Sequence, residues 1–430
     1  MPRLNLAVFG AFIFYCSGAS ATEAVLDTGN TAWLITATVL VLFMTLPGLA
    51  FFYGGLVRTK NALSILMQCF AITCLVSIAW FVGGYGLAFG NGGDWQAWIG
   101  GGNWFLANVT RDSLSGSIPE SVFLMFQMTF AIITPALVIG RFAERMKFSA
   151  VLGFSLLWLF LVYAPVCHWV WGGGWLATRG LLDFAGGTVV HLNAGVAAMV
   201  AALMLGRRRD FPEAGMSPHN MTMAVAGASM LWVGWFGFNA GSALAANGSA
   251  GMTMLVTHIS AAAGSLAWMT MEWIKYGKPS VLGIITGMVA GLGTITPASG
   301  YVSPASALLI GLVAGVVCYY ATQFVKRKLK IDDSLDVFPV HGIGGILGTL
   351  SAGIFASGEL GGAGYAEGVT MLDQLGVQAL GIAATLIWCA VGTFGIFKLL
   401  DLTVGLRVGA DHETEGLDVR DHGERAYMIS

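Results

Sequence analysis

Long apolar segments recur along the chain and are separated by shorter polar connections. Each of eleven such segments is about as long as the roughly 20 residues that a helix needs to cross about 30 Å of hydrocarbon. The pattern predicts an all-α polytopic membrane protein with eleven transmembrane helices. We expect these helices at 31–54, 62–89, 120–140, 148–170, 187–206, 220–241, 252–275, 280–297, 303–325, 337–356 and 374–400.

The composition of the chain supports this prediction. The 430 residues are 56% hydrophobic and 10% charged, whereas ordinary globular chains are about 45 to 50% apolar and about 25% charged. Sixty glycines favour close helix packing, because small residues let helices approach in lipid. The formal charge of −2 gives no basic surface for nucleic acid, and the six cysteines show no CxxC spacing. We expect no nucleic-acid partner, disulfide framework, metal site or cofactor.

Residues 1–21 have the pattern of a cleaved signal peptide. Arg3 precedes a short apolar run, and an Ala-Ser-Ala sequence closes the segment. An uncleaved anchor is the alternative, although the apolar run is short for a membrane span. The rest of the chain divides into a membrane domain at 22–400 and a polar tail at 401–430.

Basic residues fall in alternate connections between the predicted helices. Because Lys and Arg are enriched in cytoplasmic loops, this bias predicts an outside N-terminus and a cytoplasmic C-terminus in the inner (plasma) membrane. Arg111 and Arg179 lie in the opposite loops. The residues on the predicted cytoplasmic side are Arg58, Lys60, Arg141, Arg145, Lys147, Arg207, Arg208, Arg209, Lys275, Lys278, Lys326, Arg327, Lys328, Lys330, Lys398, Arg407, Arg420 and Arg425.

The first ten predicted helices divide into two groups of five. An odd number of spans reverses direction, so the second group would enter the membrane inverted relative to the first. The fifth and tenth helices each carry an aspartate followed by a histidine, Asp183 with His191 and Asp336 with His341. This predicts an inverted five-helix repeat plus a final helix, with the working site near the bilayer midplane where the two halves meet.

Several unusual strings spread over the whole mature chain carry a family resemblance. They include LFMTLPGLAFFYGGLVRTKN, FQMTFAIITPALVIGRFAER, WGGGWL, LDFAGGTVVHLNAG, GWFGFNAGSA, DVFPVHGIGGILGT and EGLDVRDHGERAY. With these strings the sequence resembles the ammonium transporter (Amt/methylammonium permease) family. It looks like the Amt branch rather than the Rhesus-type branch, because it keeps Trp171 and Ser242 of the outer site. The resemblance implies a transporter of ammonium, ammonia and methylammonium for nitrogen uptake.

His191 and His341 are the first candidate site residues. Ionisable side chains inside a membrane are rare and often functional, and two histidines on related helices could share a proton between ring nitrogens. The residues alone also allow two separate core histidines, each bonded to a backbone carbonyl. The resemblance implies that they are the twin histidines of the pore.

Aromatic residues form the second group of candidates. On spacing alone Phe130 and Phe238 are ordinary packing residues, and Trp171 suits a membrane-interface belt. The resemblance implies that the two phenylalanines form the outer gate and that Trp171, Ser242 and Phe130 recruit ammonium. The chemistry fits, because an indole face attracts a cation and a serine oxygen accepts an N–H bond.

The remaining polar candidates are expected to be structural. Asp183 lies where a carboxylate can cap the free N–H groups of the fifth helix. We expect a structural and electrostatic role for Asp183 and Asp336, with neither acting as a direct ligand. His168 and His258, near outer helix ends, are expected to be structural.

Free energies favour the passage of neutral ammonia. Moving an ammonium-sized ion into a low-dielectric medium costs on the order of 20 kcal/mol, whereas deprotonation costs only about 3 kcal/mol at pH 7, at 1.36 kcal/mol per pKa unit. Potassium has no proton to release and should be rejected. The resemblance further implies that the proton crosses along the histidine pair, which would make transport electrogenic.

The resemblance also implies a homotrimer and a P-II type signalling protein that binds the cytoplasmic face, with membrane lipid around the protein. We expect Glu413, Glu415 and Asp418 of the tail to pair with the basic loops at 207–209 and 326–330. An ammonium sensor that signals through its tail with little flux is the alternative function. An enzyme is not expected, because the sequence has neither HExxH nor a nucleophile elbow.

Overall fold

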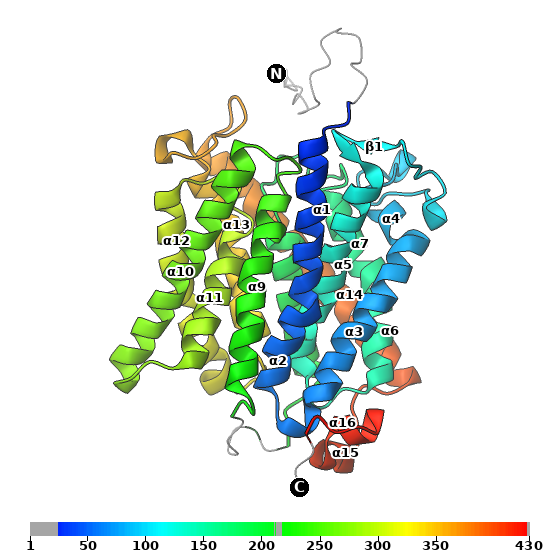
Figure 1. The fold of residues 1–430 in the computed structure, drawn as a ribbon, viewed down its shortest axis with the longest axis vertical. Helices are drawn as coiled ribbons and strands as arrows, with labels where there is room; N and C mark the ends of the chain where they lie inside the picture. Colours follow the sequence, from blue (N-terminus) through cyan, green and yellow to red (C-terminus); the bar gives the residue numbers. More distant parts are fainter. Residues whose placement is uncertain (1–24, 210, 212–216, 428–430) are drawn as a thin grey trace, which may run out of the picture.

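The structure is a computed structural model that describes residues 25–209, 211 and 217–427. Within these residues the chain is a bundle of long helices that run roughly side by side (Figure 1). The signal peptide predicted at residues 1–21 lies outside the described residues. The strands in the described part are the two-residue β1 (Leu114–Ser115) and β2 (Ile118–Pro119), which pair in an antiparallel hairpin.

Five membrane-length helical segments make up the first half of the bundle. The fourth and fifth predicted helices begin and end within a few residues of the structural bounds. The elements are α1 (Thr28–Phe43) with α2 (Ala50–Leu56), α3 (Ala62–Ala79) with α4 (Tyr85–Phe89), α5 (Glu120–Phe142), α6 (Phe148–Trp158) with α7 (Ala164–Val170), and α8 (Asn193–Leu205).

The second half contributes five more segments and the final helix. The elements are α9 (Met221–Gly241), α10 (Gly248–Tyr276), α11 (Val281–Ile295), α12 (Pro304–Gln323), α13 (Gly344–Phe355) and α14 (Met371–Thr403). In the described residues, ten helical segments are long and apolar enough to cross a membrane, and the 15-residue α11 is shorter. The predicted class, an all-α polytopic membrane protein with eleven helices, is confirmed.

Small residues bring α10, α11 and α12 into close contact. A Cβ atom added to Gly264 of α10 would lie 2.5 Å from the carbonyl oxygen of Gly287 in α11. One added to Gly315 of α12 would lie 2.6 Å from the carbonyl oxygen of Gly264. Contacts this short exclude any side chain, so glycine is needed for backbone-to-backbone packing of the kind expected in a membrane.

Two helices change their winding where the histidines lie. The segment Gly187–Leu192, which contains His191, is a wide π-helical turn before α8. The segment Phe338–Ile343, which contains His341, is the corresponding turn before α13. Such turns are often found at functional sites, and here both hold a histidine in the interior of the bundle.

The tail folds against the end of the bundle where α2 and α3 meet (Figure 1). It forms α15 (Ala410–Glu415) and α16 (Leu417–His422). The carboxylate of Asp418 accepts hydrogen bonds from the backbone N–H groups of Leu63 and Ser64, at 3.1 and 2.7 Å. The backbone N–H of Leu417 donates to the Asn61 side chain at 2.9 Å, and Leu417 itself is buried.

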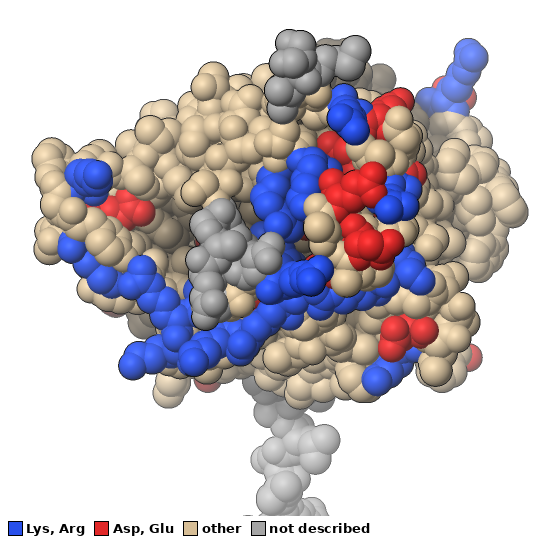
Figure 2. All heavy atoms as spheres, turned by 90° about the horizontal axis from the view of Figure 1, so that it is seen from below, with Lys and Arg blue, Asp and Glu red and all other residues tan. Residues whose placement is uncertain are grey.

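The predicted partners of the tail's acidic residues are therefore wrong. Glu413 pairs with Arg407 at 2.5 Å and Glu415 pairs with Arg420, both within the tail, while Asp418 binds backbone. The charge pattern of the tail is satisfied locally because these partners are only five or six residues away. Figure 2 shows many Lys and Arg side chains on the face that carries the tail, with acidic groups gathered on one side of it.

Candidate functional site

An outer cavity opens at the end of the bundle opposite the tail. Trp171 follows the last turn of α7, and its indole N–H donates to the backbone oxygen of Asp183 at 2.8 Å. Ser242 caps α9, and its hydroxyl donates to the backbone oxygen of Phe238 at 2.9 Å, which leaves oxygen lone pairs free to accept from a ligand. The lining residues are Phe89, Phe123, Gln127, Phe130, Val170, Trp171, Phe184, Ser242 and Leu244.

Two stacked phenylalanines separate this cavity from the interior. The rings of Phe130 and Phe238 lie 4.1 Å apart at an angle of 25°, and both side chains are buried. Phe130 also meets the ring of Trp171 edge to face, with centroids 5.8 Å apart. The four outer-site candidates thus come together from α5, α7 and α9, and the stacked pair closes the passage inward.

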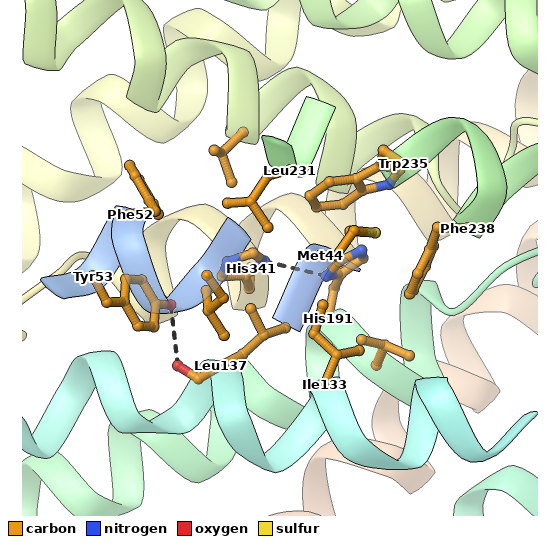
Figure 3. A pocket seen from close by; sticks show the side chains of 13 residues that line it. Met44, Phe52, Tyr53, Ile133, Leu137, His191, Leu231, Trp235, Phe238 and His341 are labelled. Atoms are coloured by element: carbon orange, nitrogen blue, oxygen red, sulfur yellow. Dashed lines mark hydrogen bonds between the residues drawn. The ribbon is translucent and has the colours of Figure 1, made fainter. Parts of the chain in front are cut away.

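His191 and His341 lie next to each other beyond the phenylalanines (Figure 3). Their Nδ1 atoms are 3.2 Å apart, and their rings are nearly parallel with centroids 5.2 Å apart. A neutral imidazole has one N–H and one lone pair, so one Nδ1 donates and the other accepts. The pair therefore exposes an N–H at one outer ring nitrogen and a lone pair at the other, which is the arrangement that a proton relay needs.

The cavity around the histidines is small and apolar. Its volume is about 10 Å³, close to the minimum that holds one water molecule. In Figure 3, Phe238 lies at one end of the row and Phe52 and Tyr53 at the other, with the histidines between them. The residues that line it are Met44, Leu49, Phe52, Tyr53, Ile133, Leu137, Val190, His191, Leu231, Trp235, Phe238, Val289 and His341.

Asp183 holds the turn that positions His191. One carboxylate oxygen accepts from the backbone N–H groups of Gly186 and Gly187 at 2.8 and 2.6 Å. The other accepts from the backbone N–H and the hydroxyl of Thr188. Gly186 has φ of +118°, a conformation that glycine adopts readily. All of these donors belong to the protein, so the geometry gives Asp183 a capping role.

The second-half counterpart of Asp183 is Asp333, not Asp336. Asp333 accepts from the backbone N–H of Phe338 at 2.8 Å, five residues ahead, just as Asp183 accepts from Thr188. Asp333 precedes its histidine by eight residues, as Asp183 does. This equal spacing was the sequence signal that could have identified it. Asp336 instead forms an ion pair with Lys326 at 2.7 Å.

The two other histidines considered as candidates, His168 and His258, lie away from the pair. The ring nitrogens of His168 face the backbone oxygens of Ala88 and Gln96 at 2.9 and 2.7 Å, which ties α7 to the outer loop. His258 is exposed on α10, where its ring lies 5.3 Å from that of Trp232. Neither lines the cavities described above.

Sequence reasoning missed two aromatic residues of the pore. Trp235 stacks on His191 with centroids 5.4 Å apart, and its indole N–H donates to Thr296 at 2.9 Å. Tyr53 lies at the inner end, where its hydroxyl donates to the backbone oxygen of Leu137 at 3.1 Å. Both lie in aromatic strings with no distinguishing pattern, so only their position in the fold reveals them.

A bundle of membrane-length helices around a narrow apolar passage, with an aromatic outer cavity and a buried histidine pair, defines a membrane protein of the transporter class. Residues 32–427 match the model of the Ammonium Transporter Family. The chain belongs to this family.

Known relatives and structures agree in sequence and fold. An ammonium transporter of Aquifex aeolicus is 46% identical over 431 residues, covering 99% of this chain and 98% of the relative. A solved structure described as a sensor Amt protein superposes with a TM-score of 0.85 at 33% identity, covering 92% of this chain and 98% of that one. The crystal structure of Saccharomyces cerevisiae Mep2 gives 0.83 at 36% identity, covering 90% and 88%.

Proposed function

We propose that this protein transports ammonium by recruiting the ion at the outer cavity, removing its proton and conducting ammonia through the histidine-lined passage. The observation that carries the proposal is the 3.2 Å contact between the Nδ1 atoms of His191 and His341 inside an apolar cavity of about 10 Å³. The family and its curated relatives, which are ammonium transporters, support the substrate.

The outer cavity suits a small cation with N–H donors. The indole of Trp171 is held in place by its hydrogen bond to the backbone oxygen of Asp183. The face of this ring can attract a cation, and the cation–π interaction contributes about 2 kcal/mol when water is excluded. Ser242 already donates its proton to Phe238, so its oxygen acts toward a ligand as an acceptor. Phe130 forms the inner wall of the same site.

The passage beyond the phenylalanines favours the neutral form. A bare ion would lose on the order of 20 kcal/mol of hydration there, while releasing a proton costs about 3 kcal/mol at pH 7. The cavity of about 10 Å³ at the histidines has room for about one molecule the size of water, a size that ammonia shares. Potassium would have to enter as a bare ion, so the same passage rejects it.

The proton takes a separate path along the histidines, and net transport is electrogenic. The complementary tautomers of His191 and His341 let a proton enter one ring while another leaves the second. Ring reorientation or a returning proton then restores the starting tautomers. Positive charge thereby crosses without an ion entering the apolar passage.

Assembly, orientation and regulation complete the proposal. The protein forms a homotrimer in the inner membrane, with the signal peptide removed, the N-terminus outside and the tail in the cytoplasm. The concentration of Lys and Arg on the tail's face supports this orientation. A P-II type protein closes the pore from this face, and the docked tail is part of its binding surface.

Electrical recording in proteoliposomes tests the mechanism. Ammonium should evoke a current in the wild-type protein, and His191→Ala or His341→Ala should change that current or the selectivity for ammonium over potassium. His258→Ala, on the exposed surface of α10, is the matched control and should behave as wild type. Wild-type currents and selectivity in both pore variants would contradict the proton relay.

A sensor function is the second candidate. The solved structure described as a sensor Amt protein and the docked helices of this chain's tail favour it. In this case ammonium binding would change the tail with little flux. Uptake of labelled methylammonium at matched protein abundance separates the two, because a sensor would bind the ion without filling the vesicles.

A further inference from the structure

A third cavity connects the histidine pair to the inner end of the bundle. It has a volume of about 100 Å³, enough for several water molecules. His341 lies in its wall, as do Asp336 and Lys326. Asp336 precedes the turn Phe338–Ile343 that contains His341, and both residues line this one cavity.

Among the described residues that line the three cavities, Asp336 is the one acidic residue, and it lines the inner cavity. Its Oδ2 atom pairs with the ammonium of Lys326 at 2.7 Å. Its Oδ1 atom is buried and accepts no hydrogen bond from the other described residues. A buried carboxylate oxygen without a donor favours the protonated acid. Burial accordingly raises the pKa of Asp336, although Lys326 counteracts it.

The Oδ1 atom of Asp333 is also buried without a hydrogen-bond donor among the described residues, but Asp183 and Asp333 differ from Asp336 in their position relative to the cavities. Asp183 uses both oxygens to accept from backbone and hydroxyl donors. Asp333 accepts from the backbone N–H of Phe338. Neither residue lines any of the three cavities described here, whereas Asp336 shares the inner cavity with His341.

We propose that Asp336, oriented by Lys326, is the proton-exchange group at the inner end of the histidine relay. A proton leaves the His341 imidazolium through water and binds the Asp336 carboxylate, which becomes a neutral carboxylic acid while His341 becomes neutral. The acid then passes the proton to water or to emerging ammonia, which becomes ammonium, and the carboxylate returns to its ion pair. This inference rests on the proposed electrogenic function.

Lys326 has a positioning role in this scheme. Its ammonium holds the ionised carboxylate between turnovers and keeps the inner cavity neutral overall. Without Asp336, the lysine would be an unpaired charge in the path of a cation and would itself obstruct charge movement. A test must therefore separate loss of the proton acceptor from loss of charge balance.

The experiment compares the wild type with Asp336→Asn and with the double variant Asp336→Asn and Lys326→Met in proteoliposomes. Ammonium-evoked current is divided by the uptake of labelled methylammonium at matched abundance. A positioned proton-transfer group commonly contributes a factor of about 100 or more, so this ratio should fall at least tenfold in both variants. The double variant leaves no unpaired lysine, so it also decides the question if the single variant fails to fold.

Two outcomes would overturn the inference while leaving the proposed function standing. One is a wild-type ratio in Asp336→Asn. The other is a ratio that is restored in the double variant, since Asp336 would then act only by balancing Lys326. A wild-type protein that takes up methylammonium without current would overturn the electrogenic proposal itself, and with it this inference.

Discussion

The two histidine-bearing turns occupy corresponding places in the two halves of the bundle but differ in their surroundings. The turn before α8 is tightly bonded, because Asp183 accepts from four consecutive backbone N–H groups and His191 stacks on Trp235. The turn before α13 has one such bond, from Phe338 to Asp333, and its His341 faces a cavity that contains an ion pair.

This difference shows how a repeated motif can serve two ends of one passage. In the outer turn the carboxylate of Asp183 is satisfied by backbone and hydroxyl donors. In the inner turn, His341 borders a cavity that is also lined by the charged side chains of Lys326 and Asp336. The tail adds to the asymmetry, because its contacts through Leu417 and Asp418 are with the start of α3, in the first half.

The largest expected effect is loss of the outer turn. Asp183→Ala removes a buried acceptor of five hydrogen bonds, and charge-assisted bonds contribute about 1.5 to 3 kcal/mol each. We expect at least about 3 kcal/mol of destabilisation, seen as a much lower thermal unfolding temperature in detergent. Asp333→Ala, with one such bond, is the matched comparison and should be milder. Equal stability of the two variants would contradict the asymmetry of the two turns.

Recruitment at the outer cavity should show the next largest effect. Trp171→Leu removes about 1 to 2 kcal/mol of cation–π attraction, so the half-saturating ammonium concentration should rise by roughly 5- to 30-fold. The half-saturating concentration is measured from the dependence of the current on ammonium concentration. Trp95→Leu, at an exposed tryptophan of the outer loop, is the control. An unchanged half-saturating concentration in Trp171→Leu would move the recruitment site elsewhere.

Removal of residues 409–430 tests the tail's link to the first half. It deletes α15 and α16 and exposes the N–H groups of Leu63 and Ser64 at the start of α3. We expect transport to fall by a few-fold, since about 1.5 to 3 kcal/mol of charge-assisted bonding at this helix end is lost. The transport rate is measured as methylammonium uptake, with the truncated and wild-type proteins at matched abundance in the membrane. Full uptake by the truncated protein would show that the tail is dispensable for activity.

The smallest expected effect separates the charge of Asp418 from its hydrogen bonds. Burial raises the pKa of Asp418 in the docked tail, so docking tolerates a neutral side chain there. Asp418→Asn keeps an acceptor oxygen and should lower uptake less than Asp418→Ala does, by a difference of about 1 kcal/mol in docking. Hydrogen exchange of the segment 60–66 reports docking directly. Faster exchange in the Asn variant than in the Ala variant would reverse this assignment.

Much of the fold was predictable because lipid imposes a simple rule. A helix that satisfies its own backbone in hydrocarbon must be long and apolar, so the spans could be located from hydrophobic runs alone. His191 and His341 were candidates because ionisable residues are rare inside a membrane, with two separate core histidines as an equal alternative. The roles of Trp171 and Ser242 followed from the resemblance to a family. Spacing alone favoured ordinary packing for the phenylalanines, because such a residue in a membrane helix carries no mark of its role.

The sequence by itself determined the helices, the alternation of basic loops and the residue types available for a pore. Only the tertiary structure decided which of them meet. The Nδ1 contact between His191 and His341 joins residues 150 positions apart, and the choice of Asp333 over Asp336 as the counterpart of Asp183 depends on where each backbone N–H points. The tail's partners were decided in the same way. Hydrophobic patterning acts on each segment separately, whereas hydrogen bonds and ion pairs act over a few ångströms, and the packing of the helices sets those distances.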